Sequence, residues 1–510
     1  MRRTLAAGFG AVMLLGVTAG LVLADGFEAK VVGSYGVEAY RKAAAEIVVH
    51  DPVGQRLYVV NGADNAIDIL DMKDPAALKK IKSIPLSQYG KNVNSVAVRG
   101  DVVVAAVEAD PKQEPGKLVV FDRDGNNPKV VTVGALPDMV TITSDGAYAL
   151  VANEGEPSKD YKNDPEGTVS IVKLADLSVR TVTFGHLKRS DFGAGAHFPS
   201  PAGTTLAQDV EPEYIALSRD NKTAFVALQE ANSIAVIDIE TAKVTKVFAL
   251  GYKDWSKHAI DVSDRDGGIN LKTWPAKSLY QPDTIATFEH EGQTYIVTAN
   301  EGDSRDYPGY SEEARVADLT LDEKVFPNAK ELQDKKALGR LKVTKAHGDK
   351  DGDGKYEEIV GYGGRSFSIW KPDGTLVYDS GNEFSTILSK MHPTWFNSQG
   401  QVKNFDSRSD DKGVEPEGLA IGTVKGKRYA FIGLERMSGI IAYDISNPVA
   451  PKFSSFFHNG KPDGDPKAKS AGDIAPEGLA FVEASKSPTG HALLVTANEV
   501  SGTTTVFELK

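Results

Sequence analysis

Seven short apolar runs, each ending in Asn, Gln or Glu, recur along the chain and constrain its fold more than any other feature. They are Leu57–Asn61, Val103–Glu108, Tyr148–Glu154, Ala224–Glu230, Tyr295–Glu301, Tyr429–Glu435 and Leu493–Glu499. Each run is too short for a typical helix and rich in residues that favour strands, so we predict that each is a buried strand. A repeat of this kind indicates an architecture built from similar units.

Other strand-like segments flank every run. Five units open with proline and an acid, at Pro137-Asp138, Pro212-Glu213, Pro282-Asp283, Pro416-Glu417 and Pro476-Glu477, and the first two open at Ala45-Glu46 and Asn94-Ser95. A third strand is predicted after each run, and a fourth follows in six units, for example at Lys129–Val133. The sequence therefore predicts an all-β, seven-bladed β-propeller with four antiparallel strands per blade.

The seventh unit runs out of chain after its third strand, at Lys510. A strand-like segment from Glu28 to Ser34 belongs to no unit, so we expect this N-terminal strand to complete the last blade and close the ring. Residues 25–510 would then form a single propeller domain. Two stretches exceed the blade template, 184–208 and 303–354, and the second is long enough to cap the channel from the fifth blade.

The first residues are typical of an export signal. Arg2 and Arg3 precede an apolar stretch from Leu5 to Leu23, and small side chains lead up to Ala24. We predict that residues 1–24 are a Sec-type signal peptide, so that the mature chain is a periplasmic or secreted monomer. The alternative is a retained membrane anchor, which the glycines within the stretch disfavour.

Composition narrows the functional classes. The chain has no cysteine, which excludes disulfides, thiol catalysis and thiolate metal sites. Its formal net charge of −12 favours cations as partners and argues against nucleic acid. The 9 histidines lack the HExxH spacing of zinc hydrolases, and no GxSxG or Walker motif is present.

Carboxylates are predicted to converge at one end of the channel. In an antiparallel blade, the start of the first strand and the end of the second are neighbours, and the first strand is innermost. The opening acids, which precede the first strand, are Glu46, Asp138, Glu213, Asp283, Glu417 and Glu477, with Ser95 as the exception. The exit acids, which follow the second strand, are Glu108, Glu154, Glu230, Glu301, Glu435 and Glu499. At a separation of about 6 Å and an effective dielectric near 20, each pair would repel by roughly 3 kcal/mol, so cations or protons must offset the charge.

Two interpretations of these acids stay open. They could be metal ligands, or they could brace neighbouring blades by accepting backbone N–H bonds. Residues that break the repeat are better functional candidates, because a bracing role would recur. The cations expected near the acids, and assigned here to phosphoryl binding, are Arg305, Arg365, Arg408, Lys412 and Arg436.

A separate calcium loop is predicted at Asp349, Asp351 and Asp353, three aspartates at alternate positions followed by Gly354. Val360 stands where such a loop usually has its last glutamate. Glu357 or Glu358 could substitute for it, and the alternative is an acidic, solvated turn. A weaker relative of the motif spans residues 261–267.

Several motifs in combination resemble the choice-of-anchor I family. They include Ala152–Pro157, Glu211–Tyr214, Thr298–Tyr307, Gly363–Ser368, Phe405–Gly413, Gly433–Arg436 and Asn498–Thr503, and the match covers nearly the whole mature chain. The family includes the mesenchyme-specific cell-surface glycoproteins of biomineral skeletons, and its bacterial members are often labelled alkaline phosphatase. The resemblance implies a propeller and phosphomonoester hydrolysis outside the cytoplasm. Members commonly carry a C-terminal anchor, and its lack here predicts a freely soluble protein.

Three functions fit these features. The first is a calcium-dependent phosphoesterase in which clustered carboxylates hold Ca²⁺ or another divalent ion and arginines hold the phosphate of a small molecule. The second is a non-enzymatic propeller that binds calcium, mineral or an extracellular partner. The third, a lactonase-type hydrolase, would more often need Asn and His among its ligands.

Overall fold

The computed structural model describes residues 26–36 and 39–510, and the predicted signal peptide lies outside them. The fold is all-β: the described residues include three short α-helices, α1 (Leu206–Asp209), α2 (Ala329–Leu332) and α3 (Glu383–Met391). No helix in this part of the chain has the length and apolar character needed to cross a membrane.

Seven sheets of four antiparallel strands contain most of the strands. The first three are β2 (Val48–Asp51), β3 (Arg56–Asn61), β4 (Ala66–Asp71), β5 (Lys79–Pro85); β6 (Val93–Arg99), β7 (Val102–Val107), β8 (Pro115–Asp122), β9 (Lys129–Ala135); and β10 (Pro137–Ile142), β11 (Tyr148–Asn153), β12 (Thr168–Lys173), β13 (Val179–Thr183). The next two are β14 (Pro212–Leu217), β15 (Thr223–Leu228), β16 (Ser233–Asp238), β17 (Lys243–Ala249); and β20 (Ile285–His290), β21 (Gln293–Asn300), β27 (Ser366–Trp370), β28 (Leu376–Asp379). The last two are β29 (Pro416–Val424), β30 (Lys427–Leu434), β31 (Gly439–Asp444), β32 (Lys452–Phe457); and β33 (Pro476–Val482), β34 (Ala492–Asn498), β35 (Thr503–Leu509), β1 (Ala29–Gly36).

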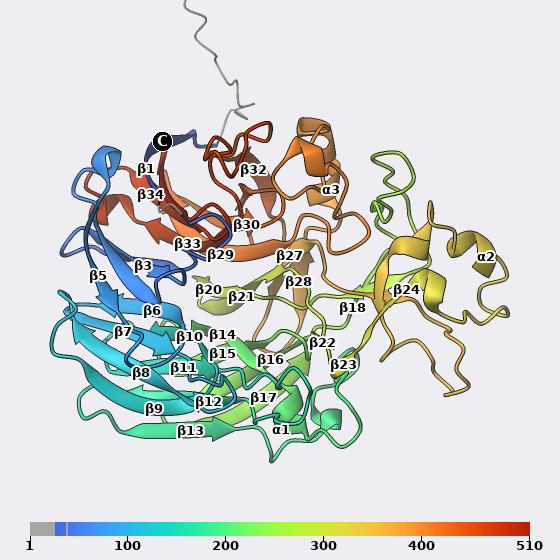
Figure 1. Ribbon diagram of the computed structural model, residues 1–510, viewed down its shortest axis with the longest axis horizontal. Coiled ribbons are helices and arrows are strands. Elements are labelled where there is room, and N and C mark those ends of the chain that lie inside the picture. The colour runs from blue at the N-terminus through green and yellow to red at the C-terminus, as the bar shows by residue number, and fades with distance from the viewer. Residues whose placement is uncertain (1–25, 37–38) are drawn as a thin grey trace, which may run out of the picture.

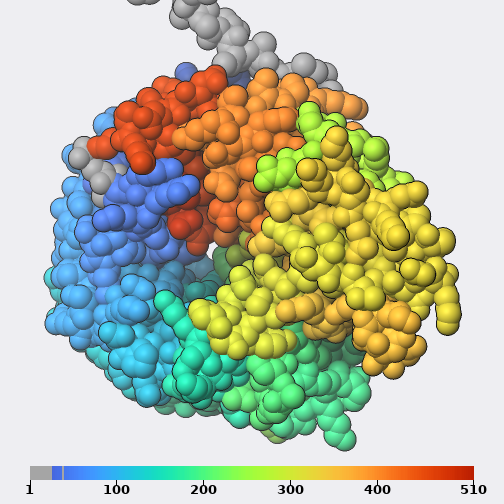
Figure 2. Space-filling model, turned by 45° about the vertical axis from the view of Figure 1, so that its right-hand side comes forward, coloured from blue at the N-terminus to red at the C-terminus, as the bar shows by residue number. Residues whose placement is uncertain are grey.

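The sheets are arranged around a central axis (Figure 1), and the space-filling view shows an opening there (Figure 2). The first strand of each sheet contacts the first strand of the next: β2 lies beside β6, then follow β10, β14, β20, β29 and β33, and β33 contacts β2. The N-terminal strand expected near Glu28–Ser34 is present as β1 and pairs with β35, with Ala29 opposite Leu509. The predicted all-β propeller fold is therefore confirmed.

The hydrophobic core lies between the sheets. One cluster packs Phe367 and Phe384 of the fifth sheet and α3 against Tyr443 of the sixth sheet. Second strands such as β3 and β34 are almost fully buried along their length, which explains their continuous apolar sequence.

Segments outside the blades form a separate small sheet. Its strands are β18 (Tyr252–Asp254), β19 (Lys277–Leu279), β26 (Val360–Gly361), β25 (Lys342–Thr344) and β24 (Glu313–Arg315), and a hairpin of β22 (Asp306–Tyr307) and β23 (Tyr310–Ser311) lies apart from it. The insertion at residues 303–354 thus folds together with residues 252–279, a pairing that the sequence analysis did not predict. In the space-filling view this region, in yellow, lies at one side of the central opening (Figure 2).

Candidate metal centre

Four of the six opening acids, Asp138, Glu213, Glu417 and Glu477, lie where the register shifts at the start of an innermost strand. In β10, Pro137 pairs with Asn153 and Met139 pairs with Ala152, so Asp138 is the extra residue between them. The register of β33 shifts in the same way around Glu477. Because a bulge turns its extra side chain out of the regular ladder, these carboxylates face the channel instead of the interior of a blade. The channel contains a cavity of about 380 Å³ whose lining includes four opening acids, Asp138, Glu213, Asp283 and Glu477.

The second sheet shows that the exception to the acid pattern is Asn94 and not Ser95. Val93 pairs with Val107 and Ser95 with Ala106, which leaves Asn94 in the bulge. Its amide donates to the carbonyl of Pro137 at 3.2 Å. The sequence alone placed Ser95 at this position, one residue too far along the chain. The bulge shifts the register, and this unit has no proline to mark where its first strand begins.

A recurrent bend holds the exit acids beside the opening acids. The residue before each opening proline has a positive φ, and examples are Leu136 at 45°, Glu415 at 51° and Ala475 at 61°. Their carbonyls accept hydrogen bonds from the backbone N–H groups of Glu154 at 2.9 Å, Glu435 at 2.9 Å and Glu499 at 2.8 Å. A positive φ is unusual for residues with a side chain, and its recurrence shows that the surrounding ladder imposes it.

Burial and mutual repulsion make these carboxylates hard to ionise. Burial, together with Glu499 and other acids, raises the pKa of Glu46 to about 8. Burial and Glu108 raise the pKa of Asp138 to about 6. Burial raises the pKa of Glu213, Glu417 and Glu477 well above the usual range, and neighbouring carboxylates add to the effect. Such shifts mark sites where a positive charge would be strongly favoured.

Three groups of acids bring carboxylate oxygens within 4.8 Å of one another near the channel: Glu154, Glu211 and Glu230; Asp283, Glu301 and Glu417; and Glu301, Glu415 and Glu435. Glu211 and Glu415 were not among the predicted ligands. Both occupy the positive-φ position, and both belong to a Glu-Pro-Glu sequence that only two of the five proline openings contain. That sequence was the signal that could have identified them.

Three of the predicted basic residues lie around Glu415. Glu415 accepts from Arg408 Nε at 2.8 Å and Arg436 Nε at 3.2 Å, and Lys412 Nζ lies 3.4 Å from it. Lys412 Nζ also lies 2.6 Å from Glu301. Although burial opposes ionisation, Lys412, Arg436 and Arg408 hold the pKa of Glu415 at about 2. Arg436 contacts Glu435 at 2.5 Å, but burial and Glu415 still raise the pKa of Glu435 to about 8.

Arg305 and Arg365 have different surroundings. Arg305 is buried and pairs with Glu211, and its Nη2 donates to the carbonyl of Asp209 at 3.0 Å. Arg365 is also buried, but it donates to the carbonyls of Asp261 at 2.8 Å, Ser409 at 3.0 Å and Asp411 at 2.5 Å. Its guanidinium therefore joins the loop at Asp261 to the loop at Ser409 and Asp411. Its role in phosphate binding stays a prediction.

The predicted calcium loop lies away from the channel, on the insertion. Oxygens of Asp349, Asp351 and Asp353 lie within 4.8 Å of one another. Asp349 accepts from the backbone N–H groups of Gly352 at 2.8 Å and Gly354 at 3.0 Å, so the turn is held by the same oxygens that would bind an ion. Glu358 pairs with Lys277 and Lys350 and does not complete the set.

The chain matches known proteins along most of its length. The family model of the choice-of-anchor I domain matches residues 46–448. Two similar proteins are the mesenchyme-specific cell surface glycoprotein of Strongylocentrotus purpuratus, 29% identical over 296 residues, and Gigasin-3a of Magallana gigas, 30% identical over 195 residues. The matched segments cover 51% and 35% of this chain, and 38% and 67% of the two relatives respectively, so the chain spans well under half the length of the first.

Two of the matching solved structures show low sequence identity to this chain. Hydrazine synthase of Kuenenia stuttgartiensis has a TM-score of 0.46 at 13% identity, and covers 91% of this chain and 96% of that one. The Cps50 propeller domain of Myceliophteria thermophila has a TM-score of 0.46 at 8% identity, with 95% and 100% covered.

Proposed function

Because the chain belongs to the choice-of-anchor I family, and because half-buried acids surround its central channel, we propose that it is an extracellular propeller that binds divalent cations of the calcium type. The observation that carries this proposal is the lack of partners for buried carboxylate oxygens. Among the described residues, Glu213 Oε2 and Glu417 Oε2 are buried without a hydrogen-bond donor. A buried carboxylate needs a proton or a cation, and oxygen-only donor sets suit Ca²⁺.

Asp283, Glu301 and Glu417 are the channel residues best placed to hold an ion, since their oxygens lie within 4.8 Å of one another. Burial and Glu301 raise the pKa of Asp283 well above its usual value, and Lys412 offsets only part of this shift. The ligands come from three different elements, and an ion would therefore tie the fifth and sixth sheets together.

The architecture we propose is a seven-bladed propeller formed by residues 25–510, closed by the pairing of β1 with β35. The cyclic contacts of the seven first strands support this arrangement. We further propose a signal peptide at residues 1–24, a periplasmic or secreted location, a monomeric state and a second calcium site at Asp349, Asp351 and Asp353. One relative is a mesenchyme-specific cell surface glycoprotein, which supports the location.

Calorimetric titration of Ca²⁺ into the metal-free protein at pH 7, in two buffers of different ionisation enthalpy, tests the channel proposal. Because the carboxylates have raised pKa values, we expect binding to release protons. Glu417→Gln should weaken binding, whereas Glu323→Gln, an exposed acid, should not. Absence of both binding heat and any calcium-dependent rise in Tm would refute the proposal.

Hydrolysis of phosphate monoesters is a second candidate, favoured by the position of three basic residues at the carboxylates. Lys412, Arg408 and Arg436 surround Glu415, and the Arg436 side chain is 30% exposed to solvent. An ion held by Asp283, Glu301 and Glu417 would activate water and polarise a phosphoryl group, which the guanidinium groups could hold.

Turnover of a chromogenic phosphate ester, measured with Ca²⁺ and with chelator, tests this second candidate. We expect calcium-dependent hydrolysis that Arg436→Ala reduces. Calcium-dependent stabilisation without turnover on several esters would instead leave a non-enzymatic propeller that binds calcium, mineral or an extracellular partner.

A further inference from the structure

Two groups of glutamates lie off the channel axis and share a construction plan. Each combines an exit acid of one sheet with the positive-φ glutamate and an exit acid of the next sheet. The first group is Glu154 after β11, Glu211 before β14 and Glu230 after β15, and the second is Glu301 after β21, Glu415 before β29 and Glu435 after β30. Glu230 departs from the plan slightly, because it is the second residue after its strand where Glu435 is the first.

The two groups differ in their counter-charges. Three basic side chains, Lys412, Arg408 and Arg436, contact Glu415 in the second group. Formal charges of −3 and +3 therefore cancel. Arg305 alone pairs with an acid of the first group, Glu211, which leaves a formal charge of −2. The other acid at Arg305, Asp209, has its own partner in Arg189 at 2.9 Å.

The two groups also differ in the pKa values of the glutamates at matching positions. Glu415 is held ionised by its three cations, with a pKa of about 2. Burial raises the pKa of Glu211 to about 7 in spite of Arg305. Burial raises the pKa of Glu230 well above the usual value, and Glu211 adds to the effect.

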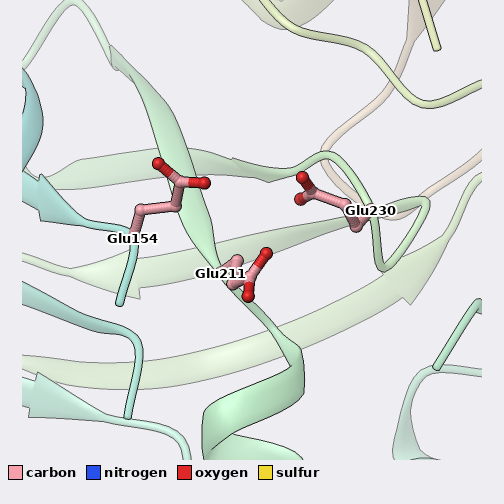
Figure 3. A group of neighbouring side chains, drawn as sticks. All are labelled: Glu154, Glu211 and Glu230. Carbon is pink, nitrogen blue, oxygen red and sulfur yellow. The ribbon is translucent and has the colours of Figure 1, made fainter. Parts of the chain in front are cut away.

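The first group also contains a buried carboxylate without a donor. Glu230 is 7% exposed, and in the described part of the chain its Oε2 has no hydrogen-bond partner. Glu154 is 8% exposed, and no described side chain donates to its carboxylate. The carboxylates of Glu154 and Glu230 point toward one another from two loops, with Glu211 between them after α1 (Figure 3). Burying two such groups together costs several kcal/mol unless a positive charge lies between them.

The insertion covers this group. Tyr307 of β22 packs against Tyr161 with ring centres 5.6 Å apart, and Tyr161 also packs against Tyr310 of β23 at 5.4 Å. Tyr310 is anchored by a hydrogen bond to the carbonyl of Pro199. Arg305, two residues before Tyr307, pairs with Glu211, so the hairpin begins beside this group. An ion bound there would be shielded from solvent.

We infer that Glu154, Glu211 and Glu230 form a second, off-axis site for one divalent cation, while in the similar group the ammonium of Lys412 and two guanidinium groups take the place of an ion. The inference rests on the proposed cation-binding function and adds a site separate from the channel. Two oxygens bound to one Ca²⁺ at 2.3–2.6 Å can be up to about 5 Å apart. The separations within the group, all under 4.8 Å, therefore allow one ion to contact all three residues.

Matched glutamine variants test the assignment. Ca²⁺ stoichiometry and affinity are measured by equilibrium dialysis for the full chain, Glu230→Gln and Glu435→Gln. We expect Glu230→Gln to bind one equivalent fewer, or to bind that equivalent at least tenfold more weakly, and Glu435→Gln to keep it. Thermal unfolding in chelator is the second measurement: Glu230→Gln should unfold at a higher temperature than the parent, because it removes an uncompensated charge, and Glu435→Gln at a lower one, because Arg436 loses a partner.

The outcomes separate this inference from the channel proposal. If the full chain binds no Ca²⁺, both fail. If it binds Ca²⁺ and Glu230→Gln retains every equivalent, or if both variants lose the same equivalent, the off-axis site is refuted and the channel proposal stands. Selective loss in Glu230→Gln supports the assignment.

Discussion

The stability of the metal-free protein should fall as the pH rises from 5 to 8, and Glu46 allows the size of this effect to be worked out. Its pKa is raised from 4.5 to about 8 by burial and by Glu499, Asp138 and Glu108. A carboxyl whose pKa is higher in the folded state binds its proton more tightly there than in the unfolded chain. Its contribution to stability is therefore complete below pH 4.5 and is lost as the pH rises through 8.

The magnitude follows from the shift. At 1.36 kcal/mol per pKa unit, the shift of Glu46 corresponds to at most about 5 kcal/mol. Glu46 is only half-buried and shares its repulsion with other acids, so about 2 to 3 kcal/mol is the expected share of this one residue. Glu46→Gln, which cannot ionise, should show a pH dependence smaller by that amount.

Urea unfolding in chelator, at intervals between pH 5 and pH 9, measures the effect. We expect Glu46→Gln to be no more stable than the parent at pH 5 and more stable by about 2 kcal/mol at pH 8. The exposed control Glu323→Gln should follow the parent curve throughout. Parallel curves for Glu46→Gln and the parent would refute the conclusion that burial and like charges keep this carboxyl protonated.

Three further predictions follow from the contacts. Lys412→Met should lower the free energy of unfolding in chelator by about 3 to 5 kcal/mol, because it leaves Glu301 and Glu415 with fewer counter-charges; a loss below 1 kcal/mol in urea unfolding would contradict this. Asp351→Asn should abolish any protection of the 349–354 loop from proteolysis by Ca²⁺ while hardly changing Tm, since the loop is largely exposed; protection that survives the substitution would argue against an ion there. Arg365→Ala should lower Tm, because three backbone carbonyls lose their donor, and loss of phosphatase turnover at unchanged Tm would instead support its predicted role in phosphate binding.

The strand repeat could be derived from the sequence because it depends on local physics. Apolar runs such as Tyr148–Asn153 must be buried, and a proline and an acid mark the start of the first strand in five of the seven units. The alternation of strands and turns then leaves few ways to bury all the runs, and a propeller is one of them. The convergence of Asp138, Glu213 and their counterparts follows from antiparallel pairing alone, so the acid-lined channel was also accessible from the sequence.

Only the tertiary structure decided which acids act together. Glu211 and Glu415 occupy equivalent positions in the repeat, but the segments that fold around them give them opposite charge environments. The partners of Glu415 come from the long segment before β29 and the loop after β30, whereas Glu211 has one partner, Arg305, 94 residues away. The sequence determines where carboxylates gather, because that depends on strand periodicity. Whether each carboxylate faces a cation, a proton or another acid depends on how the segments between the strands fold around the channel, and the strand repeat does not encode that.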